Sequence, residues 1–303
     1  MSVGDRNPTT VRPAWVRVAV WVIGAVALVY LVRVAMGVDP VEFRRLWTEV
    51  DASMGVMALA IGVLHVCAAS WMIRLLVPPS ERSGIFAIVL MSQVAKYAPG
   101  KIWGVVMQKA LAPPTLSLAR LASANVIAML LVVAAQVAVF LAALAWRSSG
   151  FPLAVLALLA SAVAIFTTLL FFARFLGEGR RIVVLPEAGP RWCGALAIAW
   201  LATAVTLAAA WIALFAGAFG LSPSLVAEGV MLSTASFIAG LASLVPAGLG
   251  VREAAFVWLG SLVSGAASAA VLTLALATRV YLVALDLLSA SMGFLLRIVE
   301  RRR

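Results

Sequence analysis

The chain is dominated by long apolar runs, each of the length that a helix needs to cross a lipid bilayer. A transmembrane helix takes about 20 predominantly apolar residues. Because the runs extend over all 303 residues, a single anchor on a water-soluble domain is excluded. We expect one all-α integral membrane domain over residues 1–303, a polytopic bundle with about six full spans. These are roughly Ala14–Met36, Met54–Val77, Leu118–Trp146, Pro152–Phe175, Gly194–Phe219 and Ala266–Ile298.

The amino-acid composition narrows the class of protein further. Hydrophobic residues make up 64% of the chain and charged residues 12%, whereas soluble domains have about 45–50% and about 25%. This excludes a soluble enzyme, a disordered chain and a disulfide scaffold. The net charge is +11, but most basic residues lie between or beside apolar runs. There they set topology and meet anionic lipid headgroups, so we expect no nucleic-acid partner.

Two further apolar stretches, 84–112 and 226–264, are interrupted by turn-forming residues. Proline removes a backbone donor and glycine allows a sharp turn, so each stretch is predicted to form a helix–turn–helix hairpin at membrane depth. Non-helical backbone is tolerated there only where protein buries it or where it lines a cavity. The predicted helix-breaking residues are Pro99, Gly100, Pro246, Gly248 and Gly250.

The two halves of the chain, 14–146 and 152–298, share one order of elements: two spans, a broken hairpin and one long span. If each hairpin is re-entrant, each half crosses the membrane three times and the second half is inverted. Broken helices at corresponding positions of inverted halves indicate a transporter-type binding site. The alternative is that both hairpins cross fully, which gives eight spans, and segment 226–244 is long enough for that.

The basic residues predict the orientation of the chain. With the N-terminus inside, most of the 23 Lys and Arg residues fall on the cytoplasmic side, as the positive-inside rule requires. The C-terminus is then cytoplasmic as well. The Ala/Val/Arg-rich, Lys-poor composition is typical of G+C-rich bacterial genomes. We therefore expect the cytoplasmic (inner) membrane of a bacterium.

Charged residues at membrane depth are the candidate site residues, since each costs about 2.5–3.5 kcal/mol or more at a helix centre. Lys96, Tyr97 and Lys101 belong to the first turn, while Arg252 and Glu253 open the helix after the second. Cations beside a helix N-terminus suit a phosphate or carboxylate, so these five are candidate contacts for an anionic headgroup. The alternative for Arg252 and Glu253 is that they neutralise each other or pair across the hairpins.

Three more charged residues are predicted to form an intramembrane network. Arg279 and Asp286 are seven residues apart in the last span and therefore share one helix face. Arg279 needs an acidic partner, and Glu228, Glu253 and Asp286 are available. An ion-pair network is the favoured interpretation, and the alternatives are a proton relay that couples transport to ions or a contact with the substrate.

Enzyme motifs are missing from the sequence. It has no aspartate pair at prenyl-transferase spacing, no convincing nucleophile–base pair and no Walker motif. Its two cysteines, Cys67 and Cys193, lie in or beside apolar runs and indicate neither a disulfide nor a metal site. We therefore expect no cofactor and no enzymatic activity.

Segments 96–103 (Lys-Tyr-Ala-Pro-Gly-Lys-Ile-Trp) and 244–253 (Leu-Val-Pro-Ala-Gly-Leu-Gly-Val-Arg-Glu) resemble the two signatures of the lysylphosphatidylglycerol synthase transmembrane-region family. The resemblance covers nearly the whole chain. Lys96 stands where arginine is usual, and Ala98 and Ala247 replace commoner residues. Membership implies a flippase-like membrane domain. The chain stops at Arg303, so we expect it to lack the soluble synthase domain of the two-part enzymes.

These observations lead to two functional hypotheses. The first is a flippase or transporter that moves an anionic or lipid-linked headgroup between leaflets, with anionic membrane lipids as partners. The second is a non-catalytic, lipid-binding accessory subunit of an envelope-lipid or glycan assembly system, with envelope-lipid biosynthesis enzymes as partners. A membrane transferase is disfavoured because the sequence has no metal-binding carboxylate cluster.

Overall fold

The computed structural model describes residues 51–97, 102–177, 189–219, 222–243, 245–264 and 269–302, with single residues between 29 and 48. These residues form helices and contain no strand. Nearly all of the first predicted span, Ala14–Met36, lies outside the described residues. Pro99, Gly100 and Lys101 of the first predicted turn also lie outside them.

Within the described residues, six helices are long and apolar enough to cross a membrane. Five of them coincide with predicted spans. The sixth, α9, was expected as the first arm of the second hairpin, either re-entrant or fully crossing, and it is a continuous helix of 20 residues with the hydropathy of a span. The six are α3 (Ala52–Leu76), α6 (Leu118–Ser149), α7 (Phe151–Gly177), α8 (Pro190–Phe219), α9 (Pro223–Ala242) and α11 (Ala269–Arg302).

The remaining elements are short, and all except η1 (Pro79–Glu81) belong to the two interrupted stretches. The loop after α3 contains this 3₁₀ helix. The first hairpin consists of α4 (Ile85–Met91), η2 (Ser92–Tyr97) and α5 (Trp103–Leu111). In the second hairpin, η3 (Pro246–Gly248) separates α9 from α10 (Val251–Ser264).

The second turn depends on its glycines. Gly248 and Gly250 have φ angles of 64° and 77°, a left-handed conformation that glycine adopts without steric cost. Ala247, directly before Gly248, is also left-handed, with φ 49°. The helix therefore ends at this turn, and α10 starts again at Val251 in a new direction.

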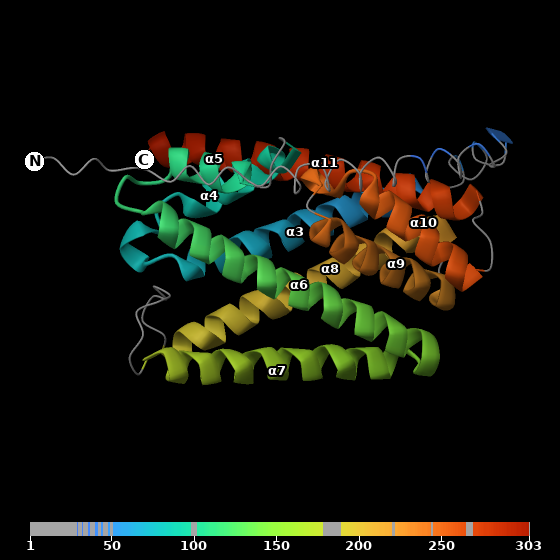
Figure 1. Ribbon diagram of the computed structural model, residues 1–303, viewed down its shortest axis with the longest axis horizontal. Coiled ribbons are helices and arrows are strands. Elements are labelled where there is room, and N and C mark those ends of the chain that lie inside the picture. Colours follow the sequence, from blue (N-terminus) through green and yellow to red (C-terminus); the bar gives the residue numbers. More distant parts are fainter. Residues whose placement is uncertain are drawn as a thin grey trace, which may run out of the picture.

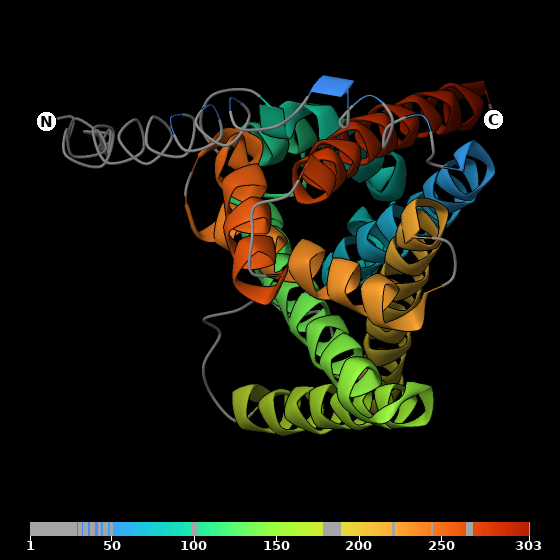
Figure 2. The same ribbon diagram turned by 90° about the vertical axis from the view of Figure 1, so that its right-hand side faces the viewer.

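The helices form an elongated bundle with α7 and α11 on opposite sides (Figures 1 and 2). The outer ends of α4 and α5 lie at the end of the bundle where α11 finishes (Figure 1). The outer ends of α9 and α10 lie at the opposite end, where α11 begins (Figure 1). The two turns meet between these ends, where η2 contacts η3.

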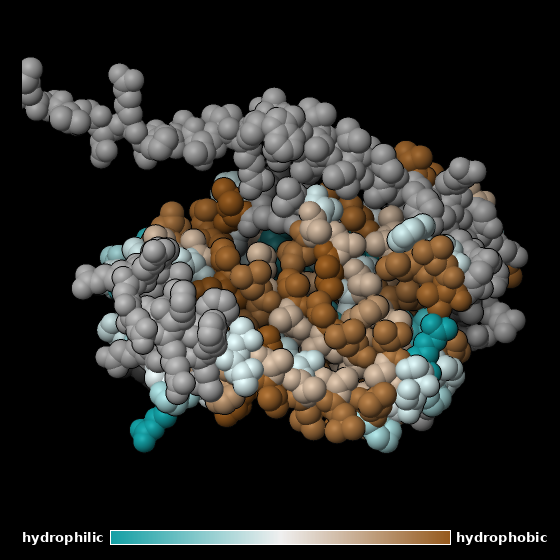
Figure 3. Space-filling model, turned by 60° about the horizontal axis from the view of Figure 1, so that its bottom comes forward, coloured by the Kyte–Doolittle hydropathy of each residue, from teal (hydrophilic) through white to brown (hydrophobic). Residues whose placement is uncertain are grey.

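The surface has the polarity expected of a membrane protein. On the face shown in Figure 3, hydrophobic residues fill the middle, and hydrophilic residues lie mainly toward the left and right ends. Helix α7 is the extreme case, because only 6% of its most apolar window is buried inside the protein. The all-helical structure and its long apolar helices are those of an integral membrane protein.

Side chain-to-backbone hydrogen bonds hold α8 between its neighbours. The fully buried Trp200 donates its Nε1–H to the Leu131 carbonyl of α6 at 2.9 Å. His65 of α3 bonds through Nδ1 to the Thr203 carbonyl, also at 2.9 Å. Helices in a membrane associate through packing and such bonds, because lipid is as apolar as the helix faces. These contacts fix the scaffold on which the hairpins rest.

Gly293 allows α11 to approach α4 closely. A Cβ atom at this position would lie 2.7 Å from both the Ala87 carbonyl oxygen and the Met91 nitrogen. Because both are backbone atoms, α4 would have to move. We expect Gly293→Ala to lower the free energy of unfolding by about 1–3 kcal/mol, the usual cost of overpacking, and to lower Tm in detergent.

Gly194→Ala is the matched control, since a Cβ atom there would meet nothing within 4 Å. Alanine is preferred to glycine inside a helix by roughly 0.5–1 kcal/mol, so the Tm of this variant should stay unchanged or rise. If both variants had the same Tm as the parent protein, that result would contradict the close approach of α11 to α4 at Gly293.

Candidate anion-binding cavity

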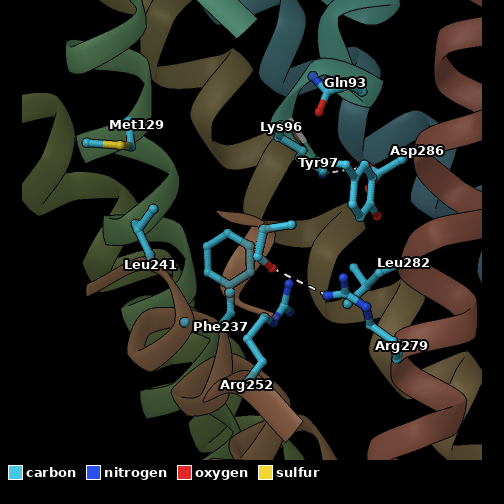
Figure 4. A pocket seen from close by; sticks show the side chains of 13 residues that line it. Gln93, Lys96, Tyr97, Met129, Phe237, Leu241, Arg252, Arg279, Leu282 and Asp286 are labelled. Carbon is cyan, nitrogen blue, oxygen red and sulfur yellow. Dashed lines mark hydrogen bonds and ion pairs between the residues drawn. The ribbon is translucent and has the colours of Figure 1, made fainter. Parts of the chain in front are cut away.

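A cavity of about 330 Å³ lies where the two hairpin turns meet α11 (Figure 4). The turns and α11 supply its charged wall, while α6 and α9 supply an apolar wall. The lining residues are Gln93, Lys96, Tyr97, Met129, Phe237, Gly240, Leu241, Ala247, Gly248, Arg252, Arg279, Leu282 and Asp286.

Asp286 of α11 holds the first hairpin. Its Oδ1 lies 2.5 Å from Lys96 Nζ, and its Oδ2 accepts a hydrogen bond from Tyr97 Oη at 2.6 Å (Figure 4). The Asp286 side chain is 3% exposed, whereas the Lys96 side chain is 44% exposed. The carboxylate thus uses both oxygens to bind η2 across a separation of 190 residues in the sequence.

Arg279 of α11 holds the second hairpin. Its Nη1 lies 3.5 Å from Glu253 Oε1 and donates a hydrogen bond to the Ala247 carbonyl at 3.3 Å. Its guanidinium also lies 5.7 Å from the centre of the Tyr97 ring, within range of a cation–π contact. One helix face therefore carries two residues of opposite charge, and each of them holds one hairpin.

Arg252 occupies the space between α9 and α10. Its guanidinium carbon lies 4.7 Å from the centre of the Phe237 ring. A Cβ atom on Gly240 would come within 2.2 Å of Arg252 Cγ, and one on Gly248 would come within 3.0 Å of it. The two glycines thus provide the room in which the aliphatic part of Arg252 lies.

The charges around the cavity do not balance within the described residues. Lys96 pairs with Asp286, and Arg279 pairs with Glu253. No described carboxylate lies within ion-pair distance of Arg252, whose guanidinium lies over the Phe237 ring and interacts with Glu253 and Asp286 at longer range. Three cations and two carboxylates therefore lie in or beside the cavity within the described residues, so its net charge is positive.

A polar cluster anchors the first hairpin to α6. Gln108 of α5 donates a hydrogen bond to Ser92 Oγ at 2.9 Å, and Asn125 of α6 donates one to Gln108 Oε1 at 2.7 Å. Both the arm that leads into the turn and the arm that leaves it are therefore tied to the same long helix. This arrangement positions Lys96 and Tyr97.

The structure brings together most of the sequence-predicted site residues that it describes. Glu253 lies next to the cavity through its contact with Arg279, and it does not pair with Arg252. Pro246 and Gly250 form the turn without lining the cavity. Glu228 lies elsewhere, with Oε2 3.8 Å from Arg147 Nη2. The predicted residues that line the cavity are Lys96, Tyr97, Gly248, Arg252, Arg279 and Asp286.

Sequence reasoning missed the residues that position Arg252. Phe237 and Gly240 belong to an apolar helix in which an aromatic residue or a glycine ordinarily serves packing. Their spacing of three residues places both on one face of α9, but nothing in the sequence marks that face as the one toward Arg252. Only the fold of the hairpin identifies them.

No family model, curated protein or solved structure matches the chain. The resemblance of segments 96–103 and 244–253 to the lysylphosphatidylglycerol synthase transmembrane-region family therefore stays a prediction. The functional argument depends on the cavity and its charges.

The Arg279–Glu253 pair can be tested by a double-mutant cycle. Both side chains are largely buried, and removing one partner of such a pair leaves an uncompensated charge. We expect Arg279→Gln to lower the free energy of unfolding by about 3–5 kcal/mol, and Arg279→Gln/Glu253→Gln to recover a large part of that loss. Thermal unfolding in detergent measures both. Additive losses in the double variant would contradict the pairing.

Proposed function

We propose that the protein is a lipid flippase or lipid transporter that moves an anionic or lipid-linked headgroup between the leaflets of a bacterial cytoplasmic membrane. The observation that carries this proposal is Arg252, a cation without a described acidic partner in a cavity between two broken hairpins. An anionic headgroup would compensate its charge. The turns of two such hairpins are the places where transporters commonly form substrate sites.

The apolar wall of the cavity favours a lipid over a water-soluble anion. Met129 lines the cavity and is 45% exposed, so the cavity reaches the outer surface of α6. Its neighbours Val126 and Leu130 are also exposed on that helix. A lipid could place its headgroup at Arg252 while its acyl chains pass along Met129 and Leu241. A free anion would gain nothing from that wall.

Helix direction supports the re-entrant layout of both hairpins. Since α3 ends and α6 begins at the same end of the bundle (Figure 1), the first hairpin crosses the membrane either twice or not at all. Its return arm α5 has 9 residues, roughly 14 Å of helix at 1.5 Å per residue. The hydrocarbon core is about 30 Å thick, so this arm is too short to cross.

The second hairpin follows the same logic from the opposite end. Helix α9 is long enough to cross, but its partner α10 has 14 residues, roughly 21 Å of helix. Since α8 ends and α11 begins at one end of the bundle (Figure 1), both arms cross or neither does. We therefore propose two re-entrant hairpins that enter from opposite sides, as inverted halves require. Movement of one hairpin at a time would open the cavity to one leaflet.

The distribution of basic residues supports the proposed orientation. The loops and helix ends where α11 finishes carry Arg74, Arg82, Lys109, Arg120 and Arg297. At the other end of the bundle, Arg147 is paired with Glu228. The positive-inside rule then places the end of α11 in the cytoplasm.

The second candidate function is a lipid-binding accessory subunit of an envelope-assembly system. It is favoured by α7, which packs against α6 and α8 but has only 6% of its most apolar window buried among the described residues. Such a helix could contact the helices of a partner protein. This function predicts stable co-purification with that partner and no lipid translocation by the protein alone.

The orientation predicts which loops react with a membrane-impermeant thiol reagent. In a Cys67→Ser/Cys193→Ser background, Ser148→Cys should be labelled in intact cells, because the α6–α7 junction faces outward. Ser80→Cys in η1 should be labelled only after the membrane is opened. Labelling of Ser80→Cys in intact cells would contradict the orientation.

The lipid site is tested with Arg252→Ala. Because this change removes the cation that an anionic headgroup would meet, we expect at least a tenfold loss of phosphatidylglycerol binding in native mass spectrometry, since such charge pairs are commonly worth about 2–5 kcal/mol. Translocation of fluorescent phosphatidylglycerol in liposomes should fall in parallel.

Arg147→Ala is the matched control, because it removes an arginine of the Glu228 pair outside the cavity. Its lipid binding and translocation should equal those of the parent protein. Normal translocation by a folded Arg252→Ala variant would disprove the proposed site. Absence of translocation by the parent protein, together with a co-purified partner, would favour the accessory subunit.

A further inference from the structure

We infer that Asp286 is the resident anion of the cavity, and that the anionic group of the ligand displaces it from Lys96 during each transport cycle. This inference rests on the proposed function and adds to it the step that couples binding to movement. In the structure, the Asp286 carboxylate already occupies the position beside Lys96 that the anionic group of the ligand would take.

The geometry of Asp286 resembles that of a bound ligand. Two oxygens of one anionic group accept bonds from Lys96 Nζ and Tyr97 Oη at 2.5 and 2.6 Å. A phosphate offers the same arrangement of acceptor oxygens, and bonds of this kind are among the strongest in proteins. Lys96 lines the cavity, and its side chain stays 44% exposed although it is paired with Asp286.

The other acid near the cavity does not fit this role. Glu253 is not among the residues that line the cavity, and its partner Arg279 also donates to a backbone carbonyl. Asp286 is the one carboxylate that lines the cavity within the described residues. A ligand at Arg252 would therefore meet Asp286 as its competitor for Lys96.

Displacement would loosen the tie between η2 and α11 and leave the second hairpin in place. The Lys96–Asp286 pair ties η2 to α11, so a ligand that takes Lys96 removes the ionic bond of the first hairpin. The second hairpin remains tied to the same helix by Arg279 and Glu253. When Asp286 binds Lys96 again, it expels the ligand. Binding thus loosens the hairpin, and reclosure drives release.

Asp286→Asn tests this inference on the full-length protein. The variant removes the competitor while it keeps Lys96 and Arg252. We expect phosphatidylglycerol to bind about tenfold more tightly, in the range measured for close charge pairs, and to be translocated about tenfold more slowly, because nothing reclaims Lys96. A merely structural role of Asp286 would instead weaken binding.

Two controls distinguish the displacement of Asp286 from Lys96 from the general effect of removing a negative charge. Glu228→Gln removes the same charge at the distant Arg147 pair and should change neither binding nor translocation. Glu253→Gln removes a carboxylate beside the cavity that does not contact Lys96. Lipid translocation by Glu253→Gln should therefore be faster than lipid translocation by Asp286→Asn. Equal slowing in Asp286→Asn and Glu253→Gln would overturn the inference.

The remaining outcomes are also decisive. If the parent protein binds phosphatidylglycerol and Asp286→Asn binds it equally or more weakly, this inference fails while the proposed function stands. If the parent protein binds no anionic lipid, the proposed function itself fails. Should Asp286→Asn not fold, Lys96→Met/Asp286→Asn replaces the whole pair by neutral side chains. Normal translocation by that double variant would overturn the inference.

Discussion

The arrangement of this protein depends on two ion pairs that α11 makes with the hairpins. Arg279 holds the second hairpin through Glu253, and Asp286 holds the first through Lys96. Both pairs lie in a bundle whose surroundings do not solvate charge, where an unpaired ion is expensive. The pairs therefore fix the positions of η2 and of the turn at η3, which are short elements. The cavity is the space that remains between them.

Broken helices make this arrangement feasible. A continuous helix satisfies its own backbone groups and presents only side chains to its neighbours. A turn inside the bundle instead exposes carbonyl groups, and the Ala247 carbonyl accepts a hydrogen bond from Arg279. The left-handed backbone at Gly248 and Gly250 allows α10 to begin again beside α9. Arg252, at the start of α10, then lies over Phe237.

The sequence predicted the helices better than their contacts. Five of the six described spans follow from apolar runs, and the second break lies where proline and glycine placed it. The sequence left open whether segment 226–244 is a re-entrant arm or a full span, because a run of about 20 residues has the same composition in either role. Glu228 was a plausible partner for Arg279, but the structure places it against Arg147.

The sequence by itself determined the long apolar helices that fit a membrane protein and the place where α9 gives way to α10. These properties are local: they follow from apolar run length and from the backbone chemistry of proline and glycine. Only the tertiary structure decided that Asp286 binds Lys96, that Glu253 binds Arg279, and that Gly240 and Phe237 form the seat of Arg252. The crossing of the helices determines which side chains become partners. For two residues 190 positions apart, no sequence pattern predicts that contact.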